Sequence, residues 1–155
     1  EGDVLEYDPD APYLKVKAKA VYAAADYTRS FRVSEDFIED SFEVNAWGEY
    51  TMDWFFYCKG NVHCPYETVP VEKIGEAEGY QYLFDIRSFK TDKDWQVEFE
   101  TEDKRIIVSV AGEEGTEVFI VNSYVTDKAN TRYGLCVRRK KENTVFNTSY
   151  KCIKK

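Results

Sequence analysis

The sequence predicts an all-β protein built from antiparallel strands, and three observations lead to this fold class. Apolar and polar residues alternate along many short segments, which is the pattern of strands with one buried face. Aromatic residues suit half-buried sheet surfaces and are abundant, with 12 Tyr, 10 Phe and 3 Trp in 155 residues. Turn signals recur about every 8–12 residues, and long helices are absent. This pattern fits an antiparallel β-barrel, with a two-sheet β-sandwich as the alternative.

The chain is expected to form a single β domain at residues 13–155, preceded by a flexible acidic leader at residues 1–12. In the first predicted strand, residues 13–22, apolar residues alternate with Lys15, Lys17 and Lys19. We interpret these lysines as a solvated strand face and not as a binding patch.

The remaining strands follow in order, with a capped helical turn predicted at residues 34–38. Gly48-Glu49 predicts a turn, and Pro70 limits residues 68–74 to a short edge strand. Further strands are predicted at residues 27–33, 42–47, 50–58, 80–87, 95–101, 104–110, 116–125, 131–140 and 148–155.

The predicted strand 50–58 is the centre of the domain, because one of its faces is wholly apolar. Its other face is mixed and carries Phe55 and Tyr57, and alternation also points Trp47 and Phe119 outward. If these four aromatics cluster, they form an exposed patch of the kind that marks a protein interface. In a sandwich, a loop would cover them.

Composition narrows the possible partners. The net charge of −8 and the isoelectric point near 4.8 argue against nucleic acid, which requires a basic surface. An acidic surface favours cationic ligands or basic proteins. No stretch is apolar enough to span a membrane, and the first residues look like a mature N-terminus and not a signal peptide.

Four cysteines indicate two disulfides and secretion, and the alternative is a zinc site. Zinc sites usually contain two pairs of ligands separated by about two to four residues. Here 5 residues separate the first two cysteines and 15 residues separate the last two. Asn147-Thr148-Ser149 is an N-glycosylation sequon, which is consistent with secretion. The cysteines are Cys58, Cys64, Cys136 and Cys152.

A closed sheet would place an aromatic lining around one small ligand. Asp53 and Asp85 interrupt apolar strands and are candidate polar anchors for an amine, through charge pairing and cation–π contact. Alternatively, the aromatics are ordinary core and both carboxylates face solvent. The candidate lining residues are Tyr22, Met52, Trp54, Phe56, Tyr82, Phe84, Trp95 and Phe99.

Residues 117–139 (EVFIVNSYVTDKANTRYGLCVRR) resemble the end of a lipocalin barrel, where a strand runs into a Thr-Asp turn and then a Tyr-led strand that often carries Cys. The resemblance is to the divergent secreted, arthropod-like members of this calycin family, although the family's N-terminal Gly-x-Trp is missing. It implies a ligand-binding barrel whose C-terminal tail is tied to a mid-barrel strand by a disulfide from Cys58 or Cys64 to Cys152. The matching positions are Thr126, Asp127, Tyr133 and Cys136.

No pattern of residues predicts catalysis. His63 is the only histidine and lies in a turn between two cysteines, while Ser109 and Ser123 lack a nucleophile-elbow motif. We therefore expect no enzyme activity, no cofactor and no metal. The predicted function is that of a secreted carrier for a small hydrophobic or amine ligand. The alternative is a secreted β-sandwich that binds a basic protein, for example a host or signalling protein, through its acidic surface.

Overall fold

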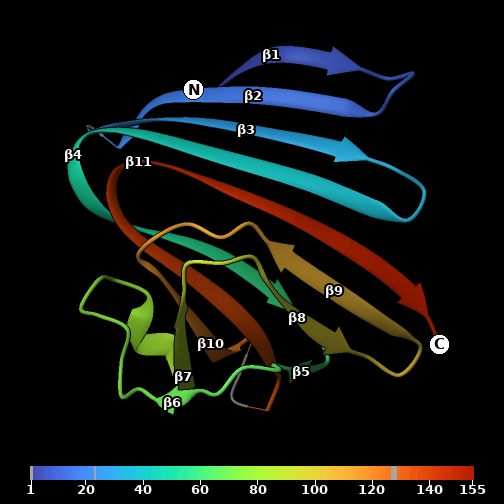
Figure 1. The fold of residues 1–155 in the computed structure, drawn as a ribbon, viewed down its shortest axis with the longest axis vertical. Coiled ribbons are helices and arrows are strands. Elements are labelled where there is room, and N and C mark those ends of the chain that lie inside the picture. The colour runs from blue at the N-terminus through green and yellow to red at the C-terminus, as the bar shows by residue number, and fades with distance from the viewer. Residues whose placement is uncertain (1, 23, 127–128) are drawn as a thin grey trace.

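The structure is a computed structural model that describes residues 2–22, 24–126 and 129–155 (Figure 1). The described chain forms one antiparallel sheet of eleven strands and a single 3-10 turn, η1 (Tyr80–Tyr82), so the all-β prediction is confirmed. The strands are β1 (Gly2–Asp8), β2 (Tyr13–Tyr22), β3 (Ala25–Val33), β4 (Phe37–Cys58), β5 (Asn61–His63), β6 (Val69–Pro70), β7 (Leu83–Thr91), β8 (Trp95–Glu100), β9 (Lys104–Val110), β10 (Thr116–Tyr124) and β11 (Thr131–Lys154).

The sheet is branched and does not close into a barrel. Its main path runs β1-β2-β3-β4-β11-β10-β7-β6. A branch starts at the second half of β11, where β9 pairs with β11, β8 pairs with β9 and β5 pairs with β8. Among the described strands, no ladder joins β1 to β6 or to β5, although closure of a barrel requires its end strands to pair. The expected closed barrel is therefore not observed.

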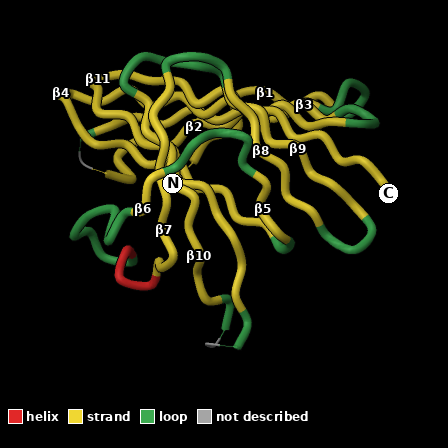
Figure 2. Tube along the Cα trace, turned by 60° about the horizontal axis from the view of Figure 1, so that its bottom comes forward, coloured by secondary structure: helices red, strands yellow, loops and turns green. Residues whose placement is uncertain are grey.

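Two long strands, β4 and β11, divide the sheet into two layers. The first half of β4 pairs with β3 and with the second half of β11, whereas its second half pairs with the first half of β11. The register shifts between Lys141 and Asn143, where β4 carries extra residues, and such a bulge bends a ladder. Figure 1 shows both strands curving from the upper strands to the lower ones, and in Figure 2 β7 and β10 lie apart from β8 and β9. The turn predicted at Gly48-Glu49 is instead this bend within a continuous strand.

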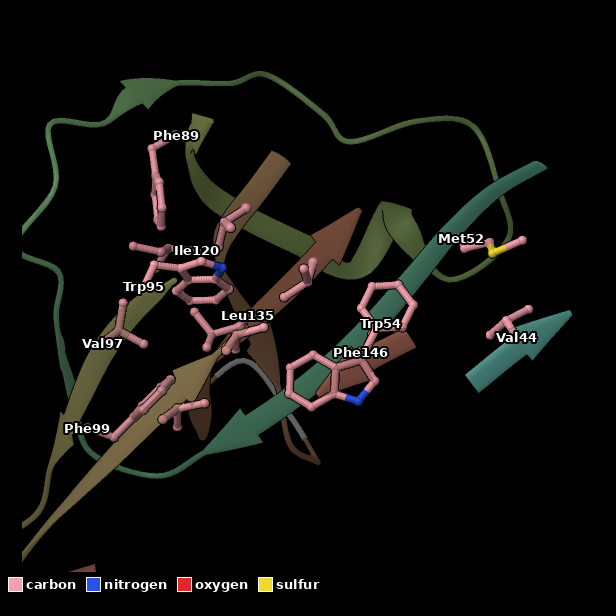
Figure 3. Close-up of a cluster of buried hydrophobic side chains, with 14 of the residues drawn as sticks. Val44, Met52, Trp54, Phe89, Trp95, Val97, Phe99, Ile120, Leu135 and Phe146 are labelled. Atoms are coloured by element: carbon pink, nitrogen blue, oxygen red, sulfur yellow. The ribbon is translucent and has the colours of Figure 1, made fainter. Parts of the chain in front are cut away.

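The main core fills the space between the two layers (Figure 3). Phe56 of the lower layer stacks on Tyr150 of the upper layer at 5.1 Å between ring centroids and meets the edge of Phe99 at 5.4 Å. Burial of such large apolar side chains is the main source of stability in a domain of this size. The buried residues of this core include Val44, Met52, Trp54, Phe89, Trp95, Val97, Phe99, Val108, Val118, Ile120, Leu135, Val137 and Phe146.

A second cluster covers the outer face of the lower layer. Phe119 and Cys136 are buried there, and Phe55 and Tyr57 pack against them beneath the segment that carries Ile74 and Tyr80. Three of the four aromatics that alternation points outward, Phe55, Tyr57 and Phe119, are therefore covered by a loop and do not form an exposed patch. The fourth, Trp47 at the bend of β4, is 73% exposed.

Two terminal or connecting segments differ from their expected conformations. Residues 2–8, expected to be a flexible leader, form edge strand β1 and pair with β2. The helical turn predicted at residues 34–38 is not formed: residues 34–36 make the tight turn of the β3–β4 hairpin, and β4 begins at Phe37, whose carbonyl accepts from the Ser34 amide at 2.9 Å. In both places, the backbone N–H and C=O groups form hydrogen bonds with a neighbouring strand, and the local sequence pattern does not reveal this pairing.

Candidate functional site

The predicted ligand-lining residues do not surround one pocket. Met52, Trp54, Trp95 and Phe99 are buried in the main core. Tyr82 is 62% exposed, and Phe84 stacks on Tyr124 at 4.7 Å between ring centroids. Phe56 and Trp95 each line a groove, but two different ones. The side chain of Tyr22 is outside the described part of the structure, as is Asp127 of the lipocalin-like segment.

Asp53 faces away from the core, as alternation predicts, but it is not solvated. Its carboxylate accepts hydrogen bonds from Arg138 Nε at 2.8 Å and Nη2 at 2.6 Å, and from the Tyr80 hydroxyl. Burial, together with the hydrogen bond to Asp53, raises the pKa of Tyr80 to about 12. This network pins the η1 segment onto the lower layer, so we assign it a structural role. Asp85 is exposed and lies at a bulge in β7, where its φ is 49°.

The four cysteines are free thiols in the structure. Cys136 is buried in the second cluster, where burial strongly raises the pKa of its thiol. Cys58 is half-buried, and its pKa is raised first by burial and then by the nearby Cys152 thiol. The predicted disulfides, including one from Cys58 or Cys64 to Cys152, are not formed in the structure and remain a proposal. His63 lies on the surface, where its Nε2 is 2.8 Å from Glu100 Oε2.

A groove of about 860 Å³ lies on the outer face of the upper layer, and we call it the polar groove. It crosses β2, β3, β4, β11, β9 and β8, which lie side by side in this order in Figure 1. Neighbouring strands are about 4.8 Å apart, so the five steps from β2 to β8 cover roughly 24 Å. The groove is thus long enough for an extended chain lying across the strands.

The strand registers place two rows of polar side chains along this groove. Both rows alternate with core residues on the same strands, so they face outward. One row runs Lys15, Ser30, Ser41 and Asn147 across β2, β3, β4 and β11. The other row runs Tyr13, Arg32, Glu39, Ser149, Ser109 and Gln96 across β2, β3, β4, β11, β9 and β8.

Most of the neutral side chains in these rows have unused hydrogen-bonding capacity. Ser41 donates to the Asn147 side-chain carbonyl at 2.7 Å. Within the described part of the chain, the side chains of Ser109, Ser149 and Gln96 form no hydrogen bond. Each hydroxyl can both donate and accept, and each amide offers both functions. The floor of the groove is therefore suited to a ligand that carries many hydroxyl groups.

The charged side chains of the polar groove are already engaged. Arg32 Nε lies 3.7 Å from Glu39 Oε2, and its guanidinium lies over the Tyr13 ring at 5.0 Å from the centroid. Asp94 accepts a hydrogen bond from the Gly112 amide at 2.7 Å. At the far end, the Tyr66 hydroxyl accepts from the Gln96 backbone amide at 3.1 Å. The groove thus has an aromatic residue at each end and no free basic cluster.

A second groove, of about 640 Å³, opens on the inner side of the upper layer, where Phe56 and Tyr150 meet. We call it the apolar groove, because apolar atoms dominate its lining. At its base Arg29 forms a two-point ion pair with buried Asp40, at 2.7 and 2.9 Å, and Tyr150 donates to the same carboxylate at 3.0 Å. The remaining lining residues include Phe31, Val33, Glu35, Asp36, Phe37, Ile38, Ile106 and Cys152.

The described residues contain no cluster of three or more side chains that could hold a metal ion. Within the same residues, no helix has the length and apolar character needed to cross a membrane.

Comparison with known proteins yields matches at the level of structure alone. No protein-family model matches the sequence, and no curated protein matches it. The whole chain superposes on heparinase III, the BT4657 gene product, with a TM-score of 0.69 at 14% identity. It also superposes on the heparan sulfate lyase HepC from Pedobacter heparinus, with a TM-score of 0.67 at 10% identity. The chain spans 22% of the length of each of these proteins, and at such identities the likeness concerns the fold.

Sequence reasoning missed the polar groove. The polar residues of the strands predicted at 27–33, 42–47 and 104–110 received no role, and Asn147 was singled out for glycosylation alone. Alternation signals which residues face outward, but it does not signal which strands are neighbours. A run of small hydroxyl and amide side chains at outward positions, in place of the usual Lys and Glu, is the one signal that was present in the sequence.

Proposed function

We propose that this chain is a non-catalytic β-sandwich domain that binds a polyhydroxylated chain, such as a polysaccharide, in the polar groove. The observation that carries this proposal is the pair of cross-strand rows, whose hydroxyl and amide groups have free hydrogen-bonding capacity. A glycan presents donors and acceptors at regular intervals along an extended chain. It therefore matches a floor that repeats polar groups at each strand across roughly 24 Å.

The structural neighbours support the same class of ligand. One is named a heparinase and the other a heparan sulfate lyase, and both names denote proteins that act on a polysaccharide. The present chain corresponds to less than a quarter of either protein. We infer that it acts as an accessory domain and performs no reaction itself, in agreement with the absence of catalytic motifs in its sequence.

The proposed secretion and disulfide bonds are compatible with this function, whereas the proposed glycosylation of Asn147 conflicts with it. Secretion and a Cys58–Cys152 disulfide would not disturb the polar groove, because both cysteines lie away from its lining. A glycan on Asn147 would occupy the groove, since this side chain forms part of its floor. Occupancy of the sequon and ligand binding are therefore mutually exclusive on one molecule.

Blocking the groove should abolish polysaccharide binding. Ser109 lies between Ser149 and Gln96 in the second row, and a Ser109→Phe ring would fill this part of the floor while suiting a strand position. We expect the unmodified protein to be retarded in native gels that contain a polysaccharide, tested over uncharged, carboxylated and sulfated polymers. The Ser109→Phe variant should migrate as in a gel without polymer.

The matched control is Thr51→Phe, an exposed position on the outer face of the lower layer that pairs with Lys140. This variant adds the same ring far from the groove and should be retarded like the unmodified protein. Equal retardation of the Ser109→Phe variant would place the glycan elsewhere. No retardation by any polymer would contradict the proposed function.

The predicted carrier function remains a second candidate, now placed at the apolar groove. Phe56, one of the predicted lining residues, meets Tyr150 there, and acidic Glu35 and Asp36 at the rim favour a cationic apolar molecule. Native mass spectrometry of protein from eukaryotic cells should then reveal a small adduct that is lost on denaturation and in an Ile38→Trp variant. An adduct that persists in that variant would exclude this groove.

A basic protein partner is the remaining proposal, and its capture in place of a small molecule would favour it.

A further inference from the structure

The charges that line the polar groove indicate which kind of glycan it accepts. The outward-facing charged residues of its lining are Arg32, Glu39 and Asp94, which sum to one net negative charge. Lys15, on the neighbouring β2 position beside Ser30, only brings this sum to zero. The domain as a whole carries a net charge of −8. A sulfated chain would therefore meet no excess of positive charge in the groove and a repelling field around it.

The one guanidinium in the groove is not available to an anion. Glu39 lies 3.7 Å from Arg32 Nε, and the face of the guanidinium covers Tyr13. An anionic group would have to displace Glu39 before it could bind Arg32 in the two-point manner that makes arginine effective toward anions. Among the lining residues, the polar side chains without a partner include the Ser109 and Ser149 hydroxyls and the Gln96 amide, which are neutral.

We propose that the polar groove binds an uncharged polysaccharide and discriminates against sulfated ones, although the structural neighbours are named for heparan sulfate. This inference rests on the proposed function and names its ligand class. Glu39 acts as the discriminating residue, because it neutralises Arg32 and presents a carboxylate in the middle of the second row.

The test compares hydroxyethyl cellulose, an uncharged polymer, with heparan sulfate in native gel retardation and titration calorimetry. We expect binding to hydroxyethyl cellulose that changes less than about two-fold between roughly 50 mM and 200 mM salt. Recognition of a polyanion by basic side chains would instead weaken steeply over this range. Heparan sulfate should bind at least about ten-fold more weakly, which corresponds to a free-energy difference of about 1.4 kcal/mol.

The variant Glu39→Gln keeps the size of the side chain and frees Arg32. It should raise the ratio of the affinity for heparan sulfate to the affinity for hydroxyethyl cellulose and make heparan sulfate binding depend on salt, because the freed guanidinium can bind an anionic group at two points. Preferential, salt-sensitive binding of heparan sulfate by the unmodified protein, lost in Ser109→Phe, would overturn this inference and leave the proposed function intact. Retardation by neither polymer nor by a carboxylated one would overturn both.

Discussion

Replacing Trp54 by alanine is expected to lower the free energy of unfolding by about 3–5 kcal/mol, the usual cost of truncating a large buried aromatic. Trp54 is 3% exposed and stacks beside Phe56 in the core between the layers. Its removal leaves a cavity whose walls belong to both layers, so the surroundings cannot collapse without shifting a strand. Urea denaturation followed by circular dichroism measures the loss.

Trp47→Ala is the matched control for this substitution. It removes the same side chain from the same strand, but Trp47 is 73% exposed, so its stability should change by no more than about 0.5 kcal/mol. The Trp54→Ala variant, studied well below its unfolding midpoint, should still bind glycan, because Trp54 does not line the polar groove. Loss of glycan binding by this folded variant, or a stability change as small as that of Trp47→Ala, would contradict the assignment of Trp54 to the core.

Replacing Arg139 by methionine is expected to destabilise the protein by about 3–5 kcal/mol, the usual cost of breaking a buried ion pair on one side. Arg139 is fully buried where β11 bends. Burial lowers the pKa of its guanidinium, and the negative charge of Glu113 offsets part of this decrease. Its nitrogens donate to Thr116, Glu113, Thr144 and to two backbone carbonyls, all at 2.8–3.0 Å. Methionine fills similar space but donates to none of these acceptors, of which Glu113 keeps only Thr144 and Lys141 as partners.

Lys140→Met controls for the loss of a positive charge at the adjacent position. Lys140 is 69% exposed and lies 3.3 Å from Glu49, so its removal should cost no more than about 1 kcal/mol. Arg139→Lys should fall between the two variants, because a lysine keeps the charge but cannot reproduce the five-donor geometry. Thermal and urea unfolding would rank the three variants, and equal stability of the Arg139 and Lys140 methionine variants would show that the buried network contributes nothing.

Alternation along the strands was enough to predict the fold class and the facing of individual residues. Trp54 and Phe56 face the core and Asp53 faces away from it, as their positions in the sequence indicate. Alternation did not predict that Asp53 would be buried. Its burial depends on Ile74 and on Tyr80, which fold over the outer face. Tyr80 was predicted to begin a strand at residues 80–87, but it lies in the 3-10 turn η1, and the strand begins only at Leu83.

The candidate site was beyond prediction for a related reason. Ser109, Ser149 and Glu39 lie in a row because β9 pairs with β11 and β11 pairs with β4, although more than 100 residues separate Glu39 from Ser149 in the sequence. The sequence also suggested breaks at Gly48 and after residue 140, where the structure has two continuous bent strands. A glycine or a charged pair marks a change of direction, but it does not reveal whether the ladder continues through it.

By itself, the sequence determined that this chain is acidic and all-β with an alternating, aromatic-rich core, because side-chain polarity at period two acts locally on each strand. Only the tertiary structure decided which strands are neighbours, that the sheet divides into two layers without closing, and that neutral polar side chains from β3, β4, β11, β9 and β8 share one groove. These features depend on the bends of β4 and β11 and on pairings between distant segments. Their free energies come from contacts that exist only after the chain has folded.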